Sequence, residues 1–165
     1  MTTPIPVRTP LPASLAGSTV LLLGGSSGIG LAAGTLLRRV GARVVLVGRD
    51  PERLKAAAGH VRAAAPSGED DVLTAAGDAG DERTLDQAFE RAGEVQHVYS
   101  TAGGIGGAGL LKDLTSESIR ETLAQAAWRP FAIARAAAAR LPPAARSPLA
   151  PASSWSGPCP ACPPR

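Results

Sequence analysis

The chain has 165 residues, of which 44% are apolar and 19% are charged, and its formal net charge is +3. This length suits one domain with a real hydrophobic core, and the scattered basic residues with few aromatics between them argue against nucleic-acid binding. No apolar run reaches the ~18 residues of a membrane span, and the first 17 residues lack the pattern of a signal peptide, so we expect a cytoplasmic protein.

The apolar pattern alternates between strand and helix periods along the chain. It predicts a strand at Thr19–Leu23, a helix at Gly28–Val40, a strand at Arg43–Val47, a helix at Pro51–Ala64, a strand at Val72–Ala75, a helix at Asp81–Ala92, a strand at Gln96–Ser100 and a helix at Ser116–Leu141. This alternation predicts an α/β fold with a Rossmann-type, doubly wound parallel sheet. Right-handed crossovers would place the carboxyl ends of the four strands at one edge of the sheet.

A glycine-rich turn, Gly24-Gly25-Ser26-Ser27-Gly28-Ile29-Gly30, joins the first strand to the first helix. Gly24 can take a tight turn, Gly28 would let a pyrophosphate approach the backbone, and Gly30 would let the helix pack close to the strand. The free N–H groups of the helix N-terminus would face the anion. The turn therefore predicts a phosphate cradle, with a plain connecting turn as the alternative.

The spacing Gly-x-x-x-Gly-x-Gly, with two serines inside it, resembles that of the short-chain dehydrogenase/reductase family. The stretch 43–54 resembles the second strand and following helix of that family. Asp78 resembles its adenine-contacting Asp, and Thr101-Ala102-Gly103 resembles its Asn-Asn-Ala-Gly element with Thr101 in place of Asn. The resemblance covers about residues 18–141 and implies an NAD(P)-binding oxidoreductase that transfers hydride at carbonyl or alcohol groups. The cofactor-binding residues it implies are Gly24, Ser26, Ser27, Gly28, Ile29, Gly30, Arg49, Asp78, Ala102 and Gly103.

The end of the second predicted strand bears on the choice of cofactor. Gly48 and Arg49 stand where an acidic side chain would bind a ribose 2′-hydroxyl. A guanidinium group can bind a phosphate through paired hydrogen bonds, so the sequence favours NADP over NAD. Two alternatives stay open: Asp50 could pair with Arg49 or Arg53, and Arg49 could be a solvated surface residue. Asp78 could likewise be only a turn or cap residue.

The resemblance also implies catalytic groups that this chain lacks. In the family a Tyr donates the proton, helped by a Lys one helical turn later and by a Ser. The single tyrosine here, Tyr99, falls in the fourth predicted strand, and the only lysines are Lys55 and Lys112. We assign no catalytic residue. Ala126 replaces the Asn that the family often carries in the fourth helix, and Pro130 is expected to kink or interrupt that helix.

We expect three segments: a flexible region at residues 1–17, a dinucleotide-binding domain at 18–141, and a Pro/Ala-rich, disordered tail at 142–165. The sheet would then be incomplete at its C-terminal side, as in a family member truncated before Tyr-x-x-x-Lys. A change of reading frame near Pro143 is one hypothesis for this tail. Cys159 and Cys162 have redox or metal spacing but no second pair, and we assign no metal site.

Three functional hypotheses follow from this sequence. The first is a reductase-like, NADP-binding oxidoreductase that is catalytically incomplete. The second is a non-catalytic NADP-binding or interaction module, which would pair with a second copy or with a full-length relative. The third is an inactive, frameshifted fragment. Neither a nucleic acid nor a membrane is an expected partner, and residues 103–109 suggest only a flexible segment beside the nicotinamide.

Overall fold

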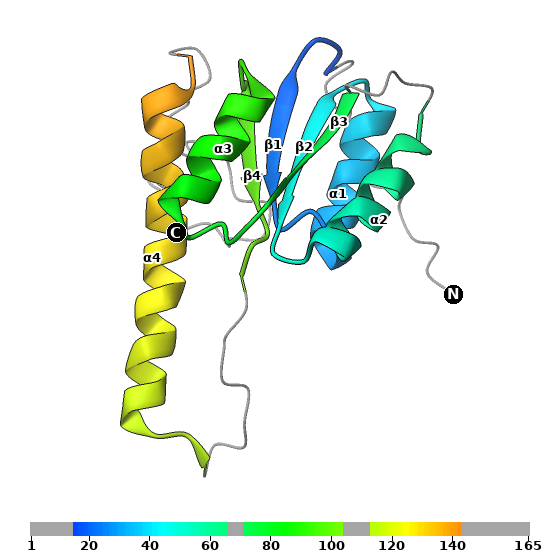
Figure 1. Cartoon of the computed structure of the whole chain (residues 1–165). Helices are drawn as coiled ribbons and strands as arrows, with labels where there is room; N and C mark the ends of the chain where they lie inside the picture. The colour runs from blue at the N-terminus through cyan, green and yellow to red at the C-terminus, as the bar shows by residue number, and fades with distance from the viewer. Residues whose placement is uncertain (1–14, 66–70, 104–112, 143–165) are drawn as a thin grey trace, which may run out of the picture.

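The computed structural model describes residues 15–65, 71–103 and 113–142. Its elements, in chain order, are β1 (Thr19–Leu23), α1 (Gly28–Arg39), β2 (Arg43–Gly48), α2 (Pro51–Arg62), β3 (Val72–Ala76), α3 (Glu82–Ala92), β4 (His97–Ser100) and α4 (Ser116–Arg140) (Figure 1). Every predicted strand and helix is present, and each end lies within two residues of its predicted place.

The four strands form one parallel sheet in the order β3-β2-β1-β4. Val20 of β1 lies opposite Val44 of β2 on one side and His97 of β4 on the other. After β3, at one edge of the sheet, the chain therefore passes β2 and β1 and adds β4 at the other edge. The direction in which successive strands are added reverses at this connection. This arrangement confirms the α/β fold with a Rossmann-type parallel sheet.

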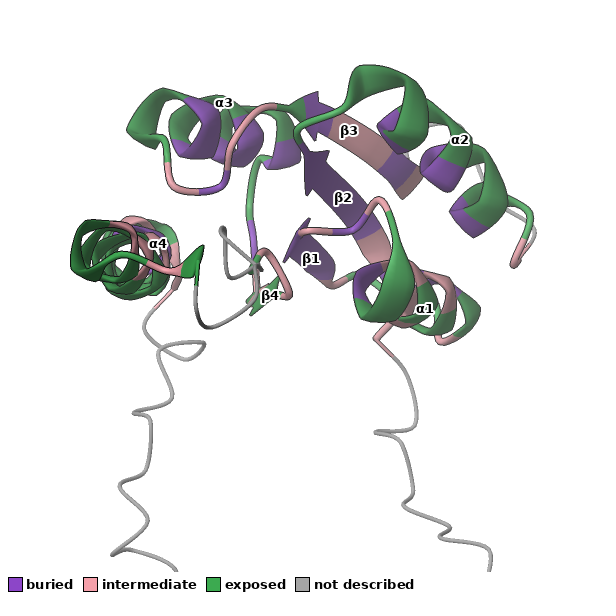
Figure 2. Cartoon of the chain, turned by 90° about the horizontal axis from the view of Figure 1, so that it is seen from below, coloured by how far each residue is buried: buried purple, intermediate pink, exposed green. Residues whose placement is uncertain are grey.

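Helices cover both faces of the sheet, as Figure 2 shows. Alternate residues of a strand point to opposite faces, so Val20 and Leu22 pack toward α1 and α2, while Leu21 and Leu23 pack toward α3 and α4. All four of these side chains are buried. The near-continuous apolar strands in the sequence are thus explained by a sheet that is covered on both sides.

The helix α4 continues through Pro130, so the expected interruption is wrong. Proline removes one backbone N–H, and the carbonyl of Ala126 loses its usual helical partner. Both Ala126 and Pro130 are exposed, which allows water to bind that carbonyl. Tertiary contacts hold the helix on either side of the proline: Trp128 donates a hydrogen bond to the Gly80 carbonyl, and Arg135 pairs with Glu82.

Two arginines cover the outer edge of β3. Arg62 from α2 donates to the Val72 carbonyl at 2.7 Å, and Arg91 from α3 donates to the Thr74 carbonyl at 2.5 Å. These two carbonyls lie two residues apart and so point to the same side of the strand, away from β2. The guanidinium groups therefore satisfy main-chain acceptors that an edge strand leaves without partners.

Several sequence predictions lie outside the described residues. They are most of the flexible N-terminal segment, the segment 104–109, the tail after Pro142, its hypothetical frame change, Lys112, and the pair Cys159 and Cys162. Among the helices of the described part, none combines the length and the apolarity that a membrane crossing requires.

Candidate functional site

A cavity of about 430 Å³ opens where the four strands end, on the side of their carboxyl termini. Seven of the ten predicted cofactor-binding residues line it: Gly24, Ser26, Ser27, Arg49, Asp78, Ala102 and Gly103. The other three, Gly28, Ile29 and Gly30, form the first turn of α1 beside it. The cavity thus collects residues from the ends of all four strands, at the point where the strand order reverses.

The glycine turn is pressed against the end of β4. Gly24 has a φ of +87°, and a Cβ atom there would lie 2.6 Å from the Ala102 nitrogen. A Cβ on Gly30 would lie 2.1 Å from the Gly24 carbonyl oxygen. The Thr101 hydroxyl donates to that same oxygen at 3.2 Å. Glycine is therefore required at both positions by close packing within the protein itself.

Gly28 and the start of α1 differ from this packed region. Gly28 has a φ of +52°, and a Cβ there would meet no described atom within 4 Å. Asp50, Asp81 and Thr115 each cap their helix with a side-chain hydrogen bond, whereas Ser27, the N-cap of α1, makes no such bond. The first N–H groups of α1 therefore lack a side-chain acceptor beside the cavity. Ile29 is 74% exposed.

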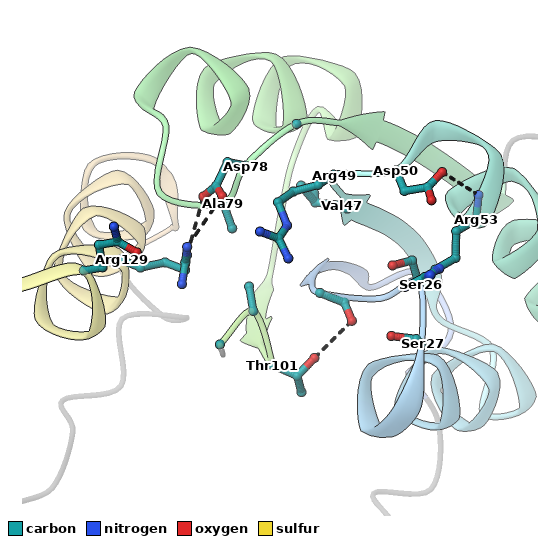
Figure 3. A pocket seen from close by; sticks show the side chains of 16 residues that line it. Ser26, Ser27, Val47, Arg49, Asp50, Arg53, Asp78, Ala79, Thr101 and Arg129 are labelled. Carbon is teal, nitrogen blue, oxygen red and sulfur yellow. Dashed lines mark hydrogen bonds and ion pairs between the residues drawn. The ribbon is translucent and has the colours of Figure 1, made fainter. Parts of the chain in front are cut away.

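Arg49 points into the cavity from the end of β2 (Figure 3). Asp50 is occupied elsewhere, because its carboxylate accepts the N–H groups of Glu52 at 3.0 Å and Arg53 at 3.1 Å and so caps α2. In the described part of the chain, Asp50 makes no ion pair with either Arg49 or Arg53. The cap thus engages the carboxylate next to Arg49 in the chain with backbone N–H groups.

Asp78 lies across the cavity from the glycine turn. Its Oδ1 accepts the Gly80 N–H at 2.7 Å, so Asp78 has the turn role that the sequence left open as an alternative. Its carboxylate also pairs with Arg129 at 3.5 Å. The Gly80 hydrogen bond lowers the pKa of Asp78 below its ordinary value; burial opposes this, and Arg129 and Arg49 add to the lowering. The group is therefore an ionised acceptor at neutral pH.

Besides Asp50 and Thr101, three polar residues outside the predicted cofactor-binding set line the cavity: Arg53, Gln125 and Arg129. Arg53 reaches toward Ser26 from the first turn of α2, and its place in the stretch 43–54 was a usable signal (Figure 3). The other two belong to α4, about fifty residues after Asp78. Nothing in their local pattern separates them from ordinary solvated helix residues.

The residues that could serve catalysis do not gather in this cavity. Tyr99 is 45% exposed on β4, as expected for an edge-strand residue, and does not line the cavity. Lys55 lines a separate, smaller cavity between α2 and β3. Within the described residues, the site therefore offers cations, hydroxyls and backbone N–H groups that suit an anionic ligand, without a tyrosine–lysine pair.

The sequence profile described as short chain dehydrogenase matches residues 18–154, which is most of the chain. The chain belongs to the short chain dehydrogenase family. The family is one of oxidoreductases, and the parallel sheet and the cavity at the β1–β4 boundary agree with this membership.

One curated relative and two solved structures are similar to parts of this chain. A protein of Streptomyces sp. (strain C5), named "Putative daunorubicin C-13 ketoreductase DnrU", is 52% identical over 68 residues, which cover 41% of this chain and 24% of the relative. A short-chain type dehydrogenase/reductase from Mycobacterium ulcerans is 29% identical with a TM-score of 0.66, over 77% of this chain and 47% of that one. L-Sorbose reductase from Gluconobacter frateurii, solved with NADPH and L-sorbose, has a TM-score of 0.64 at 24% identity, over 76% of this chain and 48% of that one. The chain thus spans about half the length of these structures and about a quarter of that curated relative.

Proposed function

We propose that this chain binds NADP in the cavity at the carboxyl ends of its strands and prefers it to NAD. The observation that carries the proposal is the pair Arg49 and Asp50: the guanidinium group points into the cavity, while the Asp50 carboxylate, at the cavity wall, accepts two backbone N–H groups as the cap of α2. A 2′-phosphate would accept hydrogen bonds from Arg49, and Arg53, which also lines the cavity, would add a second positive charge.

The glycine turn supports the same proposal at the pyrophosphate. The backbone at Gly28 is open, and the N–H groups of the first turn of α1 have no side-chain cap. A pyrophosphate there would accept hydrogen bonds from these groups and be stabilised by the positive end of the helix dipole. The bound cofactor would supply or accept the hydride, and this chain's residues would hold and orient it.

We further propose that the chain by itself does not complete carbonyl reduction. Proton transfer needs a donor within hydrogen-bond reach of the reacting oxygen, and the chain's one tyrosine lies outside the cavity, on an edge strand. The described residues therefore favour the second hypothesis, an NADP-binding module that does not catalyse the reaction. NADPH oxidation that depends on an added carbonyl compound would contradict this part of the proposal.

The cofactor preference is tested by titrating NADPH and NADH into the wild type and Arg49→Ala, with calorimetry and thermal melting in the same samples. Charge-assisted hydrogen bonds contribute about 1.5–3 kcal/mol, so the variant should bind NADPH about ten- to a hundredfold more weakly and NADH nearly unchanged. Arg39→Ala is the control, because Arg39 is exposed on α1 away from the cavity. Equal affinity of the wild type for the two cofactors would overturn the proposed preference.

A further inference from the structure

Arg129 of α4 reaches into the cavity from the side opposite the glycine turn. Its Nε lies 3.5 Å from Oδ1 of Asp78, and its Nη2 lies 3.5 Å from Oδ2 (Figure 3). The Arg129 side chain is only 19% exposed, whereas that of Asp78 is 39% exposed. The guanidinium group is thus the inner partner and the carboxylate is the one open to a ligand.

The hydrogen bonds of the Asp78 carboxylate leave one position open. Oδ1 accepts the Gly80 N–H and faces Arg129 Nε, and Oδ2 faces Arg129 Nη2. A carboxylate has about four lone-pair positions, so one remains, on Oδ2. Because an ionised carboxylate only accepts hydrogen bonds, that position suits an N–H donor of a ligand and repels a carbonyl oxygen.

A second contact from the same helix fixes the turn that carries Asp78. Trp128, the neighbour of Arg129, donates from Nε1 to the Gly80 carbonyl at 3.1 Å. The turn is therefore held by α4 at both its side chain and its main chain. Gly80 also lies against Arg129, since a Cβ there would be 3.7 Å from Nε. The orientation of the carboxylate consequently depends on α4, although Asp78 itself follows β3.

We propose that Arg129 is a positioning residue for base recognition: it orients the Asp78 carboxylate so that its open lone pair selects a purine that carries an exocyclic amine. Such a base is adenine, and hypoxanthine, which presents a carbonyl at the same place, is disfavoured. The inference rests on the proposed NADP function and adds to it a residue that decides which base is accepted. In this arrangement Arg129 directs two of its five N–H donors, on Nε and Nη2, at the Asp78 carboxylate.

The test compares the dissociation constants of NADPH and of its hypoxanthine analogue, measured by calorimetry on the full chain. The wild type should favour NADPH by about tenfold, the effect of one well-made hydrogen bond. In Arg129→Met this ratio should fall to about threefold or less, since the stem stays and the orienting donors are lost. Arg129→Lys should recover part of the ratio, because it returns a cation that can pair with the carboxylate.

Arg135→Met is the matched control. Arg135 lies on the same helix and pairs with Glu82 of α3, outside the cavity, so its loss weakens the contact of α3 with α4 without touching Asp78. It should lower the melting temperature about as much as Arg129→Met and leave the base preference unchanged. A base preference that survives in Arg129→Met, or falls equally in Arg135→Met, would overturn the inference alone. A wild type that binds neither nucleotide would overturn the proposed function, and this inference with it.

Discussion

Gly30 shows how one missing side chain sets the geometry of the site. A methyl group there would lie 2.1 Å from the Gly24 carbonyl oxygen and 2.6 Å from the Thr101 hydroxyl oxygen. The carbonyl belongs to the backbone, so it cannot move without moving the whole turn. Gly30 therefore fixes the distance between the start of α1 and the end of β4, and through it the shape of the cavity.

We predict that Gly30→Ala destabilises the protein by about 1–3 kcal/mol, the usual cost of forcing an atom into a packed region. Urea unfolding followed by circular dichroism measures this free energy. The control is Gly59→Ala in α2, where the new methyl group meets nothing within 4 Å. That control should stabilise the protein by about 0.5–1 kcal/mol, since alanine is the better helix former. A Gly30→Ala variant as stable as the wild type would show that the turn can shift freely.

At the scale of elements, the two outer strands of the described sheet have different edges. The outer side of β3 is covered by Arg62 and Arg91, which come from helices on opposite faces. On β4, His97, Tyr99 and Ser100 are exposed, and the strand pairs only with β1 among the described strands. Long, polar side chains from flanking helices thus protect one edge from pairing with other chains.

We predict that the double variant Arg62→Met, Arg91→Met lowers the free energy of unfolding by about 1–3 kcal/mol, because two backbone acceptors lose charged donors. It should also associate as its concentration rises, since the edge becomes available for strand pairing. Urea unfolding and light scattering over a concentration series measure the two effects. Arg120→Met, an exposed change on α4 that is far from β3 in the sequence, should show neither effect.

At the scale of the whole molecule, acid should weaken the fold because it protonates carboxylates that accept hydrogen bonds in the native state. The pKa of Asp81 lies below its ordinary value of 3.8 because the Thr84 hydroxyl and N–H donate to its carboxylate. The pKa of Asp78 is lowered too. A carboxyl group with a lowered native pKa stabilises the fold above its ordinary pKa, and this stabilisation is lost as the pH falls through the native value.

We predict that the difference in melting temperature between the wild type and Asp81→Ala is constant above the ordinary pKa of 3.8 and shrinks as the pH falls below it. Thermal melting from neutral to acid pH measures this difference. The control is Thr115→Ala, which removes the cap of α4. This cap is a threonine hydroxyl, which does not titrate in this pH range. Its effect on the melting temperature should therefore not follow the Asp81 profile. A difference for Asp81→Ala that stays constant down to the lowest pH would contradict the prediction.

The sequence was sufficient to predict the order of the elements and the convergence of the strand ends, because both depend on local apolar periods and on the handedness of crossovers. It could not predict that Arg129 meets Asp78, since that contact joins residues 51 positions apart and depends on how α4 is rotated. The continuity of α4 was missed for a similar reason. Proline is unfavourable in an isolated helix, but the contacts of Trp128 and Arg135 stabilise this one on both sides.

The edge of β4 that pairs with no strand in the described part of the chain has a consequence for how the cavity would respond to a neighbour. Thr101 follows directly after β4, and its backbone N–H and hydroxyl bind the carbonyls of Leu23 and Gly24. A strand that paired with β4 would therefore stiffen the residues that hold the glycine turn in place. Stiffening would reduce the entropy that the turn loses when a nucleotide binds. By thermodynamic reciprocity, the nucleotide would in turn strengthen the pairing of that strand, so the two events would be cooperative.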